Sequence, residues 1–211
     1  MVLLKDLNSV FKLEKDIQKN QLAQKYFVKL HSIYKLMISD KLDKAIREVP
    51  DFPKPGISFK DIHTILLDPE LSTEIIEAFI ERLKGNKIDA IIGVESRGFL
   101  FGLMLANKMG LPFIPIRKVG KLPGETLRFK YDLEYGSSEV EVHKSDIQKG
   151  WNVVLHDDLL ATGGTASAAS ELMQQLGAKV AAFAFLISLD FLKGNEKLEK
   201  YSKNIISLKR Y

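Results

Sequence analysis

Two adjacent carboxylates, Asp157 and Asp158, follow an apolar stretch and precede a small, hydroxyl-rich turn in the segment VVLHDDLLATGGTA. Such a turn can bind a phosphate through backbone N–H groups, threonine hydroxyls and the positive end of the helix that follows. The carboxylates can accept hydrogen bonds from vicinal sugar hydroxyls or hold the water shell of a Mg²⁺ ion. The segment therefore predicts a site for a ribose 5-phosphate, with a turn formed by Ala161, Thr162, Gly163, Gly164 and Thr165.

An ordinary strand-to-helix turn is the alternative interpretation of this segment. Glycine would then serve the tight turn and threonine would cap the helix. That interpretation does not account for the two adjacent carboxylates, because their mutual repulsion is unfavourable without a cation or hydroxyl partners.

The elements that must position these residues alternate between strand and helix from residue 39 onwards. Such alternation is typical of an α/β fold whose parallel sheet has helices on both faces, and ligands then bind at the carboxyl ends of the strands. Pro50, Pro53, Pro55 and Gly56 predict an extended, turning loop, and 117–143 resemble a long loop with β-hairpin character. We expect strands at 88–94, 112–116, 151–156, 179–189 and 205–208, and helices at 39–47, 72–84, 98–109 and 164–176.

Composition excludes several classes of protein. The 211 residues are 45% hydrophobic and 27% charged, which is typical of a globular domain rather than a disordered chain. The absence of cysteine excludes disulfides and thiolate chemistry, and the four histidines are not spaced as metal ligands. No apolar run approaches the length of about 20 residues that spans a bilayer. The expected location is the cytoplasm.

The net charge of +4 belongs entirely to residues 1–36, which contain seven lysines and three acids. Apolar residues recur there at roughly helical spacing. The segment can be a helical extension of the domain, a targeting peptide, or a stretch preceding a translation start at Met37. We favour a helical extension over 1–37 without catalytic importance.

Four further segments are FPKPGISFKDI, GVESRGFLFG, IRKVGKLPGETLRFKYDLEYG and FLISLDFLKG. Together with the turn segment, and in this order, they resemble the adenine phosphoribosyltransferases of the type I phosphoribosyltransferase family. The resemblance covers about residues 39–211. It implies a phosphoribosyltransferase domain at 38–211, with a central, mostly parallel twisted sheet, helices on both faces, a small hood and a flexible lid loop. The implied reaction is purine salvage, in which adenine and phosphoribosyl pyrophosphate (PRPP) give AMP and pyrophosphate.

The resemblance also implies where PRPP binds. Negative charge builds on the departing pyrophosphate, so cations and Mg²⁺ are needed near it. The metal is held mainly through PRPP and water near the acid pair, without direct protein ligands. Arg97 alone could instead be a surface residue at a helix N-terminus. The matching residues beyond the acid pair and turn are Glu95, Ser96, Arg97, Arg117, Lys118 and Lys121, and the Glu95–Ser96 bond is typically cis in this family.

Adenine would be recognised by backbone groups, as the resemblance implies. The carbonyl of Ser58 accepts from the amino group at N6 and the N–H of Lys60 donates to N1, whereas guanine and hypoxanthine present the reverse pattern. Phe59 and Leu189 stand where the family sandwiches the purine ring, although either could be an ordinary core residue.

Glu134 matches the proton-transfer residue that the family is proposed to use on the purine nitrogens. A carboxyl beside an apolar base under a closed loop can have its pKa raised into a useful range. The alternative is one exposed glutamate among many. Gly120, Pro123 and Gly124 flank charged residues, as in a lid that excludes water, and Tyr135 can line the same pocket.

Three features depart from the family pattern or invite another function. His156 precedes the acid pair where many relatives carry an aliphatic residue, and we expect it to pack beside the site rather than to act in catalysis. Lys60 occupies a place where arginine is frequent. The basic segment 1–36 suggests a PRPP-sensing regulator that binds DNA, but it is too short for a typical winged helix. A transferase for another 6-aminopurine or for xanthine is the remaining alternative. We expect a homodimer, and neither nucleic acid nor membrane as a partner.

Overall fold

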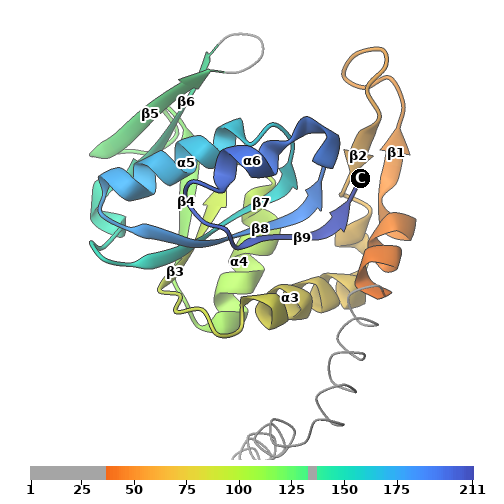
Figure 1. Cartoon of the computed structure of the whole chain (residues 1–211), viewed down its shortest axis with the longest axis horizontal. Helices are drawn as coiled ribbons and strands as arrows, with labels where there is room; N and C mark the ends of the chain where they lie inside the picture. Colours follow the sequence, from red (N-terminus) through yellow and green to blue (C-terminus); the bar gives the residue numbers. More distant parts are fainter. Residues whose placement is uncertain (1–36, 133–136) are drawn as a thin grey trace, which may run out of the picture.

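The structure is a computed structural model that describes residues 37–132 and 137–211. It has the α/β architecture that the sequence predicts (Figure 1). Residues 37–45 are helical. The labelled helices are α3 (Pro69–Leu83), α4 (Gly98–Met109), α5 (Gly164–Gln175) and α6 (Gly194–Leu198). The strands are β1 (Arg47–Val49), β2 (Phe59–Asp61), β3 (Ala90–Val94), β4 (Phe113–Lys118), β5 (Thr126–Asp132), β6 (Ser137–His143), β7 (Asn152–Leu160), β8 (Lys179–Ser188) and β9 (Ile205–Arg210).

The main sheet has the strand order β5-β6-β4-β3-β7-β8-β9. β4, β3, β7, β8 and β9 are parallel to one another. The hairpin β5–β6 joins this parallel part through antiparallel pairing of β6 with β4. The carboxyl ends of the parallel strands therefore meet at one edge of the sheet, where ligands bind in folds of this kind.

Helices cover both faces of the sheet (Figure 1). One core cluster contains buried residues of the helix 37–45, α3 and α4. A second cluster, on the opposite face, contains buried residues of α5 and α6. β7 and β8 contribute alternating residues to the two clusters, as strands do when they are buried on both faces.

Most expected elements are present, and several boundaries differ. α4 begins and ends as predicted, with Gly110 in the left-handed conformation at its C-terminus. α3 begins at Pro69 rather than Ser72, because Asp68 caps it by accepting a hydrogen bond from the N–H of Leu71. β7 continues to Leu160, so the acid pair lies within this strand rather than after it.

The N-terminal part of the described chain differs most from the prediction. The first helix ends at residue 45, and Arg47–Val49, whose first residue was expected to be helical, form β1. The loop predicted around Pro50, Pro53, Pro55 and Gly56 is present, and β2, which follows it and was not predicted, pairs with β1 in a separate antiparallel sheet. This small sheet is the hood. It projects from the same side of the body as the hairpin β5–β6, at the opposite end (Figure 1).

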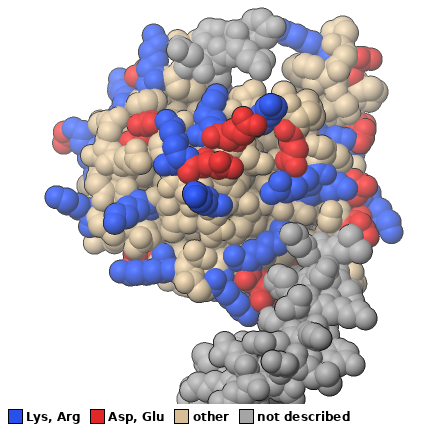
Figure 2. All heavy atoms as spheres, viewed as in Figure 1, with Lys and Arg blue, Asp and Glu red and all other residues tan. Residues whose placement is uncertain are grey.

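The surface carries charges of both signs. Acidic side chains lie among basic ones on the face that carries α5 and α6 (Figure 2). Within the described part of the chain, no helix is both long and apolar enough to cross a bilayer.

Candidate active site

The acid pair lines a polar pocket of about 390 Å³. Asp158 is nearly buried, and its Oδ2 accepts a hydrogen bond of 2.6 Å from Nε of Arg97. Asp157 Oδ1 accepts from the backbone N–H of Asp158 at 2.9 Å. The carboxyl ends of β3, β4 and β7 together build this pocket, which is lined by Glu95, Ser96, Arg97, Lys118, Asp157, Asp158, Leu159 and Thr165.

Burial and the proximity of a second carboxylate both disfavour the ionised form of Asp157. Burial raises the pKa of Asp157 well above its ordinary value, and the neighbouring charge of Asp158 raises it further. The guanidinium of Arg97 acts in the opposite direction. A ligand that brings hydroxyl donors or a cation to Asp157 would favour its ionised form.

Glu95 organises the cationic side of the pocket. The Glu95–Ser96 peptide bond is cis, as the family resemblance implies. Oε2 of Glu95 accepts from Nε of Arg117 at 3.0 Å and from the backbone N–H of Lys118 at 2.6 Å. Burial raises the pKa of Glu95, but these hydrogen bonds and charges outweigh it, so the pKa lies below its ordinary value. The ionised Glu95 therefore fixes the end of β4, where two predicted phosphate-binding cations stand.

The predicted phosphate-binding turn leads directly into α5, which begins at Gly164. Gly163 adopts a φ of 74°, where a side chain would be strained. The backbone of Gly194, at the start of α6, packs against this turn. A Cβ atom on Gly194 would lie 2.2 Å from the carbonyl oxygen of Ala161. Gly194 belongs to the segment FLISLDFLKG, but nothing in that segment predicts this contact with the turn.

Glu141, which the sequence does not single out, holds the turn at residues 120–122. Its side chain is fully buried, and Oε1 accepts hydrogen bonds from the backbone N–H groups of Gly120, Lys121 and Leu122 at 2.8 to 3.0 Å. Oε2 accepts from the hydroxyl of Thr126 at 3.0 Å. Burial raises the pKa of Glu141, but these donors outweigh it and lower the pKa. The carboxylate thus holds the turn that carries the predicted PRPP-binding residue Lys121.

The hairpin β5–β6 also contacts the phosphate-binding turn directly. The hydroxyl of Tyr131 on β5 lies 3.3 Å from Oγ1 of Thr165, to which it donates a hydrogen bond. The hairpin and the turn are therefore linked through one of the predicted phosphate-binding residues.

The predicted adenine segment lies on β2 in the hood. The ring of Phe59 stands 5.2 Å from that of Phe52 in an edge-to-face arrangement, and the guanidinium of Arg97 lies 5.7 Å from its centroid. Arg97 therefore touches both the acid pair and the adenine segment. Leu189 follows β8, packs against the core and donates its N–H to the carbonyl of Leu160 at 2.9 Å.

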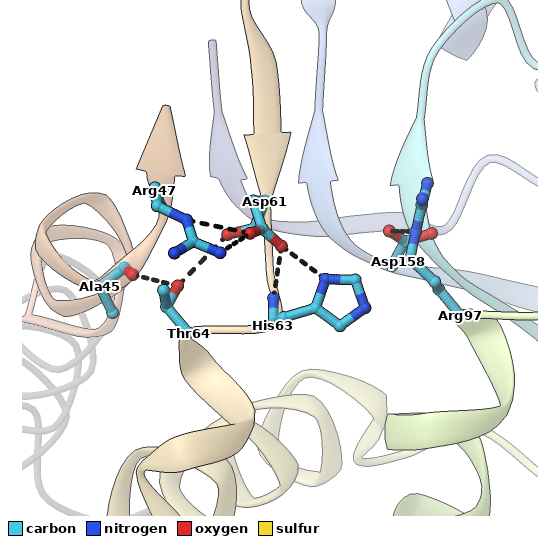
Figure 3. Close-up of polar contacts among 7 residues, drawn as sticks. All are labelled: Ala45, Arg47, Asp61, His63, Thr64, Arg97 and Asp158. Atoms are coloured by element: carbon cyan, nitrogen blue, oxygen red, sulfur yellow. Dashed lines mark hydrogen bonds and ion pairs between the residues drawn. The ribbon is translucent and has the colours of Figure 1, made fainter. Parts of the chain in front are cut away.

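Polar contacts of Asp61 and Thr64 anchor β2 to the preceding strand and helix (Figure 3). Asp61 pairs with Arg47 of β1 and accepts from the backbone N–H of His63 at 2.9 Å. Arg47 first, and then His63, hold the pKa of Asp61 well below its ordinary value. Thr64 adds a hydrogen bond to the carbonyl of Ala45. Sequence reasoning did not anticipate this network.

Comparison with known proteins agrees with this geometry. The family model described as "Phosphoribosyl transferase domain" matches residues 62–210. The adenine phosphoribosyltransferase of Christiangramia forsetii is 48% identical over 81% of this chain and 99% of that protein. The corresponding protein of Desulfitobacterium hafniense is 50% identical over 80% of this chain and 96% of its own length.

The chain belongs to the adenine phosphoribosyltransferase family. The crystal structure of adenine phosphoribosyltransferase from Thermoanaerobacter pseudethanolicus has a TM-score of 0.79 at 48% identity, over 82% of this chain and 99% of that one. The Saccharomyces cerevisiae enzyme, complexed with an iminoaltritol bisphosphate and adenine, has a TM-score of 0.78 at 44% identity, with 82% of this chain and 99% of that chain covered.

Two residues of interest within this adenine phosphoribosyltransferase fold lie outside the described residues. Glu134, the predicted proton-transfer residue, and Tyr135 belong to 133–136, between β5 and β6. The other predicted site residues lie on elements that end around the pocket, on the turn held by Glu141, or in the hood.

His156, the departure from the family pattern, packs in the core as expected. Its ring is fully buried and meets Phe79 edge-to-face, with 5.4 Å between centroids. Burial lowers the pKa of His156 to about 4, although the charge of Asp158 opposes this shift.

We expect the free energy of unfolding to fall as the pH drops below about 6.5. His156 of the unfolded chain then binds a proton, whereas His156 of the native state, with its lowered pKa, does not. The loss should be about 1.4 kcal/mol at pH 5.5 and grow until the pH reaches the native pKa. Urea unfolding of the wild type and of His156→Leu at pH 7.5, 6.5 and 5.5 measures it. Equal pH dependence in both proteins would contradict this assignment.

Proposed function

We propose that the chain transfers the phosphoribosyl group of PRPP to adenine, giving AMP and pyrophosphate. The observation that carries the proposal is the single pocket in which the acid pair, Thr165, the Glu95–Arg97 segment and Lys118 meet. The 5-phosphate would bind at the turn 161–165 and the first turn of α5. The ribose hydroxyls would donate to Asp157 and Asp158.

The pyrophosphate would leave toward the cations at the ends of β3 and β4. Arg97, Arg117 and Lys118 would stabilise the negative charge that develops on it, with Lys121 joining from the turn held by Glu141. The oxygen donors of the acid pair fit the water shell of a Mg²⁺ ion. Bound with PRPP near Asp157 and Asp158, Mg²⁺ would neutralise pyrophosphate charge as it departs.

Adenine would bind between the hood and the end of β8. The carbonyl of Ser58 would accept a hydrogen bond from the amino group at N6, and the N–H of Lys60 would donate one to N1. Phe59 and Leu189 would lie on the two faces of the ring. Hypoxanthine and guanine present the reverse pattern at these atoms and would leave buried groups unpaired. Glu134 would take or deliver the proton on the purine nitrogens.

The proposal extends to the organisation of the protein. Residues 1–37 would form a helical extension and 38–211 the phosphoribosyltransferase domain, in the cytoplasm, without nucleic acid or membrane as a partner. A homodimer is supported by apolar side chains exposed on α4, with exposed fractions of 37% for Leu100, 56% for Leu103 and 39% for Met104. Such a patch is typical of an interaction surface.

Formation of AMP from adenine, PRPP and Mg²⁺ tests the proposal, with hypoxanthine, guanine and xanthine assayed in parallel. We expect turnover of adenine alone. Glu134→Gln should lower kcat by about 100-fold or more, because general acid–base catalysis typically contributes about 10²–10⁴-fold. Glu139→Gln, on β6, is the matched control. Binding of PRPP without turnover of any base would favour the PRPP-sensing regulator, and turnover of another base would favour the other transferases.

A further inference from the structure

Tyr211, the residue after β9, contacts both elements that carry the proposed adenine residues. We propose that Tyr211 is a positioning residue that sets adenine affinity and specificity by joining β2 to the end of β8. The inference rests on the proposed function and deepens it, because it identifies what holds the two walls of the adenine site together. Tyr211 would touch neither adenine nor PRPP.

On the side of the hood, Tyr211 binds the side chain of Lys60. The ammonium of Lys60 lies 4.2 Å from the centroid of the Tyr211 ring. Its side chain is only 11% exposed, and its other partner is the carboxylate of Glu48, opposite it on β1. A desolvated cation over an aromatic ring is a favourable contact. The side chain of Lys60 thereby fixes β2, the strand whose backbone N–H would donate a hydrogen bond to adenine.

On the side of the main sheet, Tyr211 forms backbone hydrogen bonds with the two residues that flank Leu189. Its N–H donates to the carbonyl of Ser188 at 2.9 Å, and its backbone oxygen accepts from the N–H of Asp190 at 2.9 Å. The two hydrogen bonds flank Leu189, the residue proposed to lie against the purine ring. Tyr211 therefore fixes the backbone on both sides of that residue.

The ring of Tyr211 is itself held in place by a third element. Its hydroxyl donates a hydrogen bond to Asp43 of the first described helix. Asp43 also pairs with Lys209 at 2.8 Å, and the ammonium of Lys209 lies 5.0 Å from the centroid of the Tyr211 ring. Burial and then this hydrogen bond raise the pKa of Tyr211. The ring thus has a defined position from which it can orient Lys60.

Recognition by backbone groups makes such an anchor necessary. Every residue carries the same backbone carbonyl and N–H, so these groups can distinguish adenine from hypoxanthine only if the strand holds them in the correct position. A binding constellation must be held within about 0.5 Å of its productive geometry to be effective. The hood is a two-stranded sheet, and such a sheet is marginal without packing against other elements.

Steady-state kinetics of Tyr211→Ala and Tyr211→Phe test the inference in the full chain. Tyr211→Ala should raise KM for adenine by about ten-fold or more and lower the preference for adenine over hypoxanthine, with KM for PRPP changed less than about two-fold. Tyr211→Phe keeps the ring over Lys60 and should stay within about three-fold of the wild type.

Tyr201→Ala is the matched control, because Tyr201 also carries a lysine over its ring, with the ammonium of Lys200 at 4.5 Å. It should lower the Tm without changing KM for adenine. An unchanged KM for adenine in Tyr211→Ala, or equal changes for both substrates, would overturn the inference. Should Tyr211→Ala not fold, Lys60→Met keeps the backbone N–H and must raise KM for adenine. The wild-type assay alone decides the proposed function, so the two failures are distinguishable.

Discussion

Replacing Asp158 with asparagine should lower kcat/KM for PRPP by about 100-fold or more. The carboxylate is nearly buried and pairs with Arg97 at 2.6 Å. In the proposed complex it accepts hydrogen bonds from ribose hydroxyls, and hydrogen bonds to a charged group contribute about 1.5–3 kcal/mol each. An amide has the same shape, but it lacks the charge and offers only one acceptor oxygen. Initial rates at varied PRPP and saturating adenine measure the effect.

Asp68→Asn is the matched control for this prediction. Asp68 caps α3 away from the pocket, and asparagine is an equally good N-cap. The control should leave both kcat and KM close to those of the wild type. An Asp158→Asn protein that keeps wild-type kcat/KM for PRPP would remove the acid pair from the proposed ribose site.

Replacing Glu141 with alanine should lower kcat/KM for PRPP by about 10- to 100-fold although Glu141 would not contact the substrate. The change removes the acceptor shared by the N–H groups of Gly120, Lys121 and Leu122. It also leaves Arg128 without the buried carboxylate 3.3 Å from its Nε. Arg128 is 55% exposed and can be hydrated, so the main loss is that of hydrogen bonds to a charged carboxylate, which contribute about 1.5–3 kcal/mol each. The turn should then detach and Lys121 lose its defined position.

Glu139→Ala is the matched control for Glu141, because it lies two residues earlier on the same strand and is only half-buried. We expect the Glu141 variant to lose PRPP affinity and thermal stability together, whereas the control keeps both. Circular dichroism melts and PRPP titrations follow the two quantities separately. A Glu141→Ala protein with unchanged PRPP affinity would show that the turn 120–122 is positioned by other contacts.

The sequence predicted well where one local pattern determines one structure. The apolar run of β3 and the glycine that ends α4 each specify their conformation within a few residues. The parallel sheet then follows from the alternation of elements, and the place of the pocket follows from the sheet. The packing of His156 in the core agrees with the prediction, because the residues that precede it in β7, Val153, Val154 and Leu155, are apolar and buried.

Residues whose role depends on distant segments could not be predicted. The alternation of Val140 and Val142 around Glu141 indicates a solvent-facing glutamate, yet the turn 120–122 covers that face and buries its side chain. β1 and β2 are short and contain charged residues, and residues that favour turns lie next to them. Strand propensity therefore does not reveal them. The contact of Gly194 with Ala161 also joins parts of the chain that share no local pattern.

The narrow attachment of the hairpin β5–β6 has a further consequence. β5 and β6 pair over seven positions, whereas β6 meets β4 at only two, Arg117 and Lys118. Regions of a protein open locally when few contacts hold them to the rest. Side chains add to this attachment, because Val140 and Val142 are buried in the cluster that α5 also lines. The backbone pairing at Arg117 and Lys118 is therefore the part of the attachment that can open most readily. A pyrophosphate group held by these two cations would stabilise, by mass action, the form in which β6 is paired with β4. Binding at the site would therefore also stabilise this edge of the sheet.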